Sequence, residues 1–166
     1  MRKFTFLAMV AALSLVLISN AYAKKDSTPV NEAGKTAANF KLPDLSGKNY
    51  NLSDYKGKQP VMLFFWTTWC PFCQMEIKKI ADNKAELAKS GIQVLAIDIG
   101  EPKAKVSRFI QSRKIDITVL LDEDSSVSNT YNVMGVPTFY ILNKQGQIVS
   151  EGNKFPQNYQ ELISKK

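Results

Sequence analysis

The stretch "WTTWCPFCQMEI", Trp66–Ile77, contains both cysteines of this 166-residue chain, Cys70 and Cys73, with two residues between them. An uninterrupted apolar run, residues 60–66, precedes them and predicts a strand that is buried on both faces. From Cys73 to residue 90 apolar residues recur at helical spacing, and Gly91 is a good helix terminator. We therefore expect the cysteines at the point where a buried strand ends and a helix begins.

This position predicts redox-active cysteines. The N–H groups of the first helical turn have no partner within the helix, and the helix dipole adds partial positive charge. A thiolate at Cys70 would be stabilised there, so Cys70 is the expected nucleophile. Cys73, one turn later, is expected to be more buried and to attack the mixed disulfide that Cys70 forms with a partner. Pro71, between them, suits an early helix position.

Other uses of the pair fit the sequence less well. A structural disulfide between the two cysteines would close so short a loop that it would constrain the unfolded chain little. A structural zinc site needs four ligands, whereas the chain has two cysteines and no histidine. A c-type haem site needs a histidine after the second cysteine, and Gln74 stands there. We expect neither a metal nor an organic cofactor.

The N-terminal residues have the pattern of a secretory signal. Arg2 and Lys3 precede an apolar run, residues 4–18, and the small residues of Ala21–Ala23 follow. The run is shorter than the ~20 residues that span a bilayer as a helix. We expect a signal peptide over residues 1–23 and a periplasmic or other extracytoplasmic protein, with an uncleaved membrane anchor as the alternative. The basic residues are scattered, so the net charge of +7 does not predict nucleic-acid binding.

The rest of the chain reads as one domain. Residues 24–39 are polar and small, which predicts a flexible linker ahead of a domain over residues 40–166. A short hairpin is expected near residues 40–52. Apolar strands then alternate with helical patterns, which predicts an α/β fold with a central mixed sheet and helices on both faces. The further expected strands are 92–99, 117–122, 138–143 and 147–152, and the further expected helices are 103–113, 125–131 and 157–165.

A second motif, "GVPT", Gly135–Thr138, precedes one of these strands. A cis Val136–Pro137 bond there would expose the backbone groups of Val136 beside the cysteines. A bound polypeptide could then pair with Val136 as an added strand. The alternative is that Pro137 only marks the start of the strand.

Taken together, these motifs resemble the thioredoxin superfamily, specifically the exported TlpA/ResA-like thiol–disulfide oxidoreductases. The resemblance covers roughly Phe40 to Gly152. It implies a thioredoxin fold with an N-terminal β-hairpin and a helical insert after the second strand. It also implies Cys70 as nucleophile, Cys73 as resolving cysteine and Pro137 as the cis proline. The matching stretches are "FKLPDLSGKNYNLSDYKGK", "FFWTTWCPFC", Glu76, "VLAIDIGE", "YNVMGVPTFYILNKQGQIV" and Gly152.

The chain departs from cytosolic thioredoxins at two positions. Phe64 stands where they carry a buried aspartate, and Lys78 stands where their helix often has a proline. Glu76 is a candidate replacement for the missing acid, because it lies three residues after Cys73 and shares its helix face. ResA-like proteins carry an acidic residue at this position. The alternative is a solvated Glu76 that pairs with Lys79.

The resemblance also predicts how the protein meets its substrate. Trp69 is expected to line a docking surface, and we assign substrate binding to Trp69, Pro71, Phe72, Val136 and Pro137. Trp66, in contrast, is expected in the core.

The predicted activity is disulfide exchange with protein thiols and disulfides. The absence of histidine between the cysteines favours a reductant, fed with electrons by a membrane protein. Exported proteins are the expected substrates, with apocytochrome c as one candidate. Two alternatives stay open. A thiol peroxidase is one, since Thr67 lies three residues before Cys70, although the expected proline between them is missing. A non-enzymatic binding module on the thioredoxin fold is the other.

Overall fold

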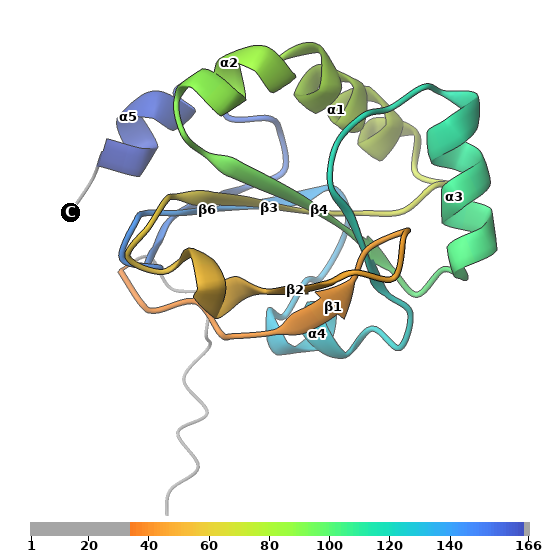
Figure 1. The fold of residues 1–166 in the computed structure, drawn as a ribbon, viewed down its shortest axis with the longest axis horizontal. Coiled ribbons are helices and arrows are strands. Elements are labelled where there is room, and N and C mark those ends of the chain that lie inside the picture. Colours follow the sequence, from red (N-terminus) through yellow and green to blue (C-terminus); the bar gives the residue numbers. More distant parts are fainter. Residues whose placement is uncertain (1–33, 165–166) are drawn as a thin grey trace, which may run out of the picture.

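A five-stranded sheet forms the centre of the molecule in the computed structural model, which describes residues 34–164 (Figure 1). The strand order is β5-β4-β3-β6-β7. β3 and β4 are parallel, as are β4 and β5, whereas β6 is antiparallel to both β3 and β7. The strands are β3 (Val61–Trp66), β4 (Gln93–Ile99), β5 (Val119–Asp122), β6 (Thr138–Leu142) and β7 (Ile148–Gly152).

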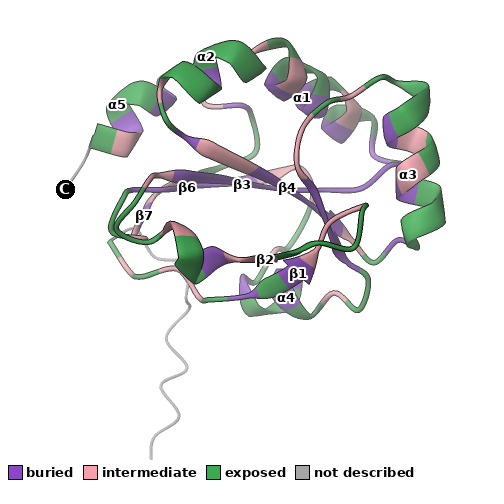
Figure 2. Ribbon diagram, in the orientation of Figure 1, coloured by how far each residue is buried: buried purple, intermediate pink, exposed green. Residues whose placement is uncertain are grey.

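The sheet is covered on both faces, which explains why all six residues of β3 are buried. Figure 2 shows the central strands largely buried and the helices buried only on their inner sides. One face is covered by α1 (Pro71–Asp82), α2 (Lys84–Lys89), α3 (Lys103–Ser112) and α5 (Tyr159–Ser164). The other face is covered by the hairpin of β1 (Lys41–Pro43) and β2 (Asn49–Asn51), by the 3-10 helix η1 (Leu52–Tyr55) and by α4 (Ser126–Thr130).

The predicted architecture is confirmed. The mixed sheet, the helices on both faces and the N-terminal hairpin are all present. α3 follows β4, the second strand of the main sheet along the chain, where the resemblance places a helical insert. Each run of apolar residues that predicted a strand contains one, because a strand between two covered faces needs apolar side chains on both.

The helix expected over residues 73–90 differs in its bounds. It begins earlier, at Pro71, because Cys70 caps it, and it is interrupted at Asn83. The side-chain amide of Asn83 donates to the Lys79 carbonyl at 2.8 Å. Asparagine favours such local bonds over continued helix, and the chain therefore forms two shorter helices, α1 and α2.

Within the predicted linker, residues 24–39, the described residues 34–39 are hydrogen-bonded to the domain. β7 is an edge strand, and its neighbouring turn offers free backbone groups to this segment. Gly34 N donates to Ile148 O at 2.7 Å, and Ala37 N donates to Gly146 O at 2.9 Å. These bonds hold the segment against the domain. In residues 34–164 no helix is long and apolar enough to cross a membrane, and the predicted signal peptide, residues 1–23, lies outside the described residues.

Candidate active site

Cys70 lies at the N-terminus of α1, just beyond the carboxyl end of β3, as the sequence predicts. Its backbone is extended, and its sulfur accepts a hydrogen bond from the backbone N–H of Cys73 at 3.2 Å. Both cysteines are buried and neither is in a disulfide in this structure. An N–H group directed at Sγ would stabilise negative charge that develops there during exchange.

Cys73 has the environment of a protonated thiol. Burial is the main cause that raises its pKa, and the hydrogen bond with Cys70 adds to it. A backbone hydrogen bond from Thr67 acts in the opposite direction but is outweighed. The two cysteines therefore differ as a nucleophile and a resolving thiol should, since only the attacking thiol of such a pair needs to be ionised before a substrate arrives.

The cis-proline loop lies beside the cysteines. The Val136–Pro137 bond is cis, and the Cys70 thiol donates to the Val136 carbonyl oxygen at 3.7 Å. Val136 and Pro137 are both partly exposed. The structure thus brings together two motifs that are 66 residues apart in the sequence.

Large apolar side chains stand exposed around the cysteines. Trp69 and Phe72, both assigned to substrate binding from the sequence, are 65% and 66% exposed, and Pro71 is exposed as well. Met75, on the next turn of α1, and Met134, before the cis-proline, are also exposed, although neither was among the predicted site residues. Trp66 is fully buried, as expected for a core residue.

Glu76 is buried on the same side of α1 as Cys73. One of its carboxylate oxygens accepts from Lys79 Nζ at 2.8 Å, and the other accepts from the backbone N–H of Phe155 at 2.8 Å. The pairing with Lys79 that we considered is therefore present, but the solvated Glu76 is wrong, because the side chain reaches inward to the segment before α5. Its hydrogen-bond partners are Lys79 and Phe155, not Cys73.

A second acidic group, which was not among the predicted site residues, lies behind the cysteine loop. Glu101, after β4, accepts hydrogen bonds from the backbone N–H of Thr68 and from its hydroxyl, and forms an ion pair with Lys105. Asp98, on β4, is the register partner of Trp66 at the end of β3. In the sequence, the aspartate near the end of an otherwise apolar strand is the feature from which this pair could have been predicted.

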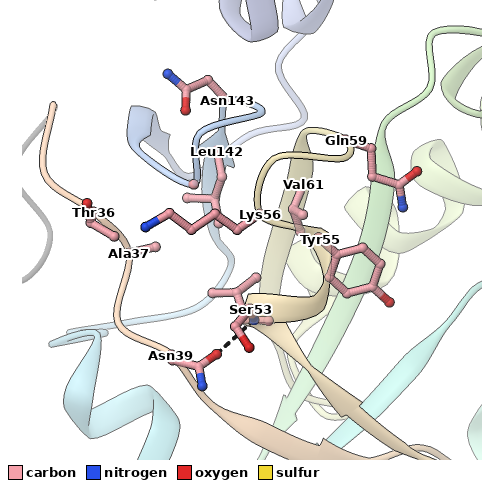
Figure 3. A pocket seen from close by; sticks show the side chains of 12 residues that line it. Thr36, Ala37, Asn39, Ser53, Tyr55, Lys56, Gln59, Val61, Leu142 and Asn143 are labelled. Atoms are coloured by element: carbon pink, nitrogen blue, oxygen red, sulfur yellow. Dashed lines mark hydrogen bonds between the residues drawn. The ribbon is translucent and has the colours of Figure 1, made fainter.

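A pocket shown in Figure 3 lies apart from this site. It is lined by the segment before β1, by η1 and by the turn after β6, and it includes Val61, the first residue of β3. The cysteines follow the opposite end of that strand. None of the predicted site residues lines this pocket, so we do not assign it to the reaction. Its polar groups include Asn39, whose side-chain oxygen accepts from Ser53 N at 2.8 Å.

Comparison with known proteins agrees with this geometry. Residues 33–151 match the family model described as the AhpC/TSA family. The chain belongs to this family. It is 34% identical over 148 residues to the thiol-disulfide oxidoreductase ResA of Geobacillus kaustophilus, a match that covers 89% of this chain and 83% of the relative. It is 35% identical over 148 residues to ResA of Bacillus subtilis, covering 89% of this chain and 80% of the relative. The chain is therefore a thioredoxin-like protein-disulfide oxidoreductase.

Solved structures share the fold of this AhpC/TSA member. A secreted disulfide oxidoreductase of Mycobacterium tuberculosis, described as homologous to DsbE of Escherichia coli, superimposes with a TM-score of 0.62 at 26% identity. That match covers 75% of this chain and 91% of the other. The peroxidoxin BcpB of M. tuberculosis gives a TM-score of 0.70 at 23% identity, over 80% and 96% of the two chains. The second likeness shows the fold alone, so the fold does not separate a disulfide reductase from a peroxidase.

Proposed function

We propose that this protein is an exported reductant of protein disulfides and that Cys70 and Cys73 carry the reaction. The observation that carries the proposal is the asymmetry of the pair. Cys70 receives an N–H bond at a helix N-terminus beside the cis-proline loop, whereas Cys73 is fully buried with a raised pKa. The ResA relatives, named as thiol-disulfide oxidoreductases, support the same chemistry.

The proposed reaction has two exchange steps. The Cys70 thiolate attacks one sulfur of a substrate disulfide, which forms a mixed disulfide and releases the other substrate sulfur as a thiolate. Cys73 then loses its proton and attacks the Cys70 sulfur, which releases the second substrate thiolate and leaves a Cys70–Cys73 disulfide. Two substrate thiols form for each protein dithiol that is oxidised, so a donor of two electrons must restore the pair.

Docking is proposed for the exposed apolar residues and the cis-proline loop. An extended polypeptide would pair with the backbone of Val136, as an added strand. Trp69 and Phe72 would contact its apolar side chains, since large exposed aromatic residues are typical of binding surfaces. The Cys70 sulfur would then lie within reach of a disulfide in the bound segment.

We expect the protein to act as a reductant because its cysteine motif has no histidine. Strong oxidants stabilise the reduced form by lowering the pKa of the nucleophile very far. Pro71 and Phe72 stand between the cysteines, and the chain has no histidine that could add such stabilisation. We expect a potential near that of thioredoxin, about −250 mV. In an oxidising compartment the electrons would come from a membrane protein, and the substrates would be exported proteins, with apocytochrome c as a candidate.

The proposed location outside the cytoplasm rests on the N-terminal signal pattern of residues 1–23. The M. tuberculosis relative, described as secreted, agrees with it.

Single cysteine variants test the proposed roles. Cys70→Ser should abolish reduction of a model protein disulfide such as that of insulin. Cys73→Ser should instead accumulate a mixed disulfide, because the intramolecular attack that releases the substrate is lost. Mass spectrometry of non-reduced samples detects the adduct. Faster alkylation of Cys73 than of Cys70 in the reduced protein would contradict the assignment.

A thiol peroxidase is the second candidate, because the chain belongs to the AhpC/TSA family and Thr67 lies three residues before Cys70. Hydrogen peroxide consumption by the reduced protein separates the two activities. A peroxide rate that exceeds the disulfide rate under the same conditions would favour the peroxidase. Unchanged partner binding in a variant with both cysteines replaced by alanine would favour a non-enzymatic binding module.

A further inference from the structure

A pair of buried carboxyl groups lies behind the cysteine loop, and the proposed exchange steps do not use it. Asp98 is fully buried and Glu101 is 5% exposed. Along β4, Val94 and Ala96 pack into the core cluster that contains Trp66 and Cys73. Because alternate residues of a strand share a face, Asp98 lies on the same face as these residues, beneath α1 and α3.

The two oxygens of Asp98 lie against Glu101. Among residues 34–164 no hydrogen bond of ordinary geometry reaches either oxygen, and the groups that face them are the carboxyl and the backbone N–H of Glu101. Two further buried polar atoms in this region, Trp66 Nε1 and Thr67 Oγ1, also have no hydrogen-bond partner in the described part. Two adjacent buried carboxyls do not both ionise, so a hydrogen bond between them requires one shared proton.

The hydrogen bonds of the pair show which group keeps the proton. Burial tends to raise the pKa of Glu101, but the bonds from Lys105 and Thr68 stabilise its charged form and lower that pKa overall. Burial, and then the neighbouring Glu101, raise the pKa of Asp98 to about 9. Both directions favour the proton on Asp98 at neutral pH, with its O–H directed to the Glu101 carboxylate.

Glu101 in turn holds the loop that joins β3 to α1. Thr68 contributes both its backbone N–H and its hydroxyl to Glu101, and its carbonyl accepts from Gln74 Nε2 at 2.8 Å. The preceding residue, Thr67, is bonded through its backbone to Cys73, and Cys70 lies two residues after Thr68. The carboxyl pair thus holds Thr68, the residue next to Thr67 and two residues before Cys70.

We propose that Asp98 is a positioning residue of the active site: its protonated carboxyl donates to Glu101 and so fixes the Thr67–Trp69 loop in the geometry that makes Cys70 reactive. The role given to Asp98 rests on the proposed function, but the experiments that test it do not require disulfide exchange with a substrate. Ionisation of Asp98 would place a second negative charge beside Glu101. Repulsion would then weaken the hold on Thr68, and the added charge would disfavour a thiolate at Cys70.

Three elements contribute charged or titratable groups around Asp98. α3 contributes Lys105, the segment after β4 contributes Glu101, and the start of α1 contributes the two cysteines. The register partners on β3 and β5, Trp66 and Leu121, do not titrate. Asp122, next on β5, instead accepts from the backbone N–H groups of Val127 and Ser128 at α4, on the other face.

The test measures the rate of alkylation of Cys70 by iodoacetamide against pH in the reduced full chain. An ordinary thiol reacts faster with rising pH until it is fully ionised. For the wild-type protein we expect the rate above about pH 9 to lie below the curve of a single ionising thiol, because ionised Asp98 disfavours the Cys70 thiolate and weakens the hold on the loop. Asp98→Asn retains an N–H donor for Glu101 but cannot ionise, so its rate should follow a single ionisation. Asp116→Asn removes one charge at a position 89% exposed and should behave as the wild type.

Carbon-13 NMR of labelled aspartate carboxyl groups gives a second readout. One resonance should titrate near pH 9, should be absent in Asp98→Asn, and should move to lower pH in Glu101→Gln. Neither readout needs a disulfide substrate, so a chain that failed to reduce insulin could still show both effects. The same alkaline shortfall in Asp98→Asn as in the wild type, or aspartate resonances that all titrate below neutral pH, would overturn the proposal.

Discussion

Glu76 is a buried carboxylate that joins α1 to the segment before α5. Its bond to the backbone N–H of Phe155 links residues 79 positions apart. Glu76→Gln would replace this charged hydrogen bond with a neutral one, so we expect the free energy of unfolding to fall by about 1–2 kcal/mol. Urea unfolding measures the loss. Lys79→Gln is the control, because Lys79 is 49% exposed and a surface ion pair contributes about 0.5 kcal/mol.

We also propose that Glu76 tunes Cys73 from the shared buried side of α1. A nearby carboxylate raises the pKa of a thiol, so Glu76→Gln should lower the pKa of Cys73 and shift the pH profile of disulfide exchange toward acid. The profile is measured on insulin reduction under single-turnover conditions. Superimposable profiles for the variant and the wild type would leave Glu76 with a structural role alone.

At the scale of single residues the sequence predicted one part of the site and missed another. Cys70 and Cys73 could be placed because their surroundings, an apolar run and a helical pattern, are local. Asp98 and Glu101 could not, because their role depends on the pairing of β3 with β4. That pairing brings Thr68 and Glu101 together across 33 positions, and no local pattern encodes it.

Among the elements, the turn between β6 and β7 depends on one glycine. Gly146 has φ +79°, a left-handed conformation that costs a residue with a Cβ roughly 1–2 kcal/mol. Gly146→Ala should therefore lower the free energy of unfolding by about 1 kcal/mol in urea. Gly152→Ala is the matched control, since Gly152 has no positive φ and nothing lies within 4 Å of an added Cβ. Equal losses in both variants would contradict the account of the turn.

The strands were predictable where their residues are apolar because both of their faces are covered. Strands β3 to β6 coincide with runs of apolar residues, since a covered sheet demands such residues. Two features were not predictable. The interruption at Asn83 depends on one side-chain bond to Lys79, and the docking of residues 34–39 depends on the free edge of β7. Both arise from contacts that a polar, small-residue composition does not reveal.

For the whole molecule, the buried pair predicts how stability depends on pH. The pKa of Asp98 is about 9 in the folded protein and about 3.9 in an unfolded chain. Between these values the folded state binds more protons than the unfolded state, so the stability that this group contributes falls as pH rises. The slope is at most about 1.4 kcal/mol per pH unit.

Asp98→Asn should remove that slope. Between pH 5 and pH 8 the wild type should lose stability relative to the variant, and unfolding in urea at the two pH values measures the difference. Asp116→Asn, an exposed substitution with the same change of charge, should follow the wild type. A variant that loses stability in parallel with the wild type over this range would show that Asp98 is already ionised.

A redox titration tests most directly whether the whole molecule works as a protein-disulfide reductant. The protein is equilibrated in buffers of graded thiol–disulfide ratio, and free Cys70 and Cys73 are counted by alkylation and mass spectrometry. We predict one reversible two-electron transition with a midpoint at about −250 mV. A midpoint more positive than about −170 mV would indicate an oxidant or an isomerase, and the absence of a reversible transition would contradict disulfide exchange by this pair.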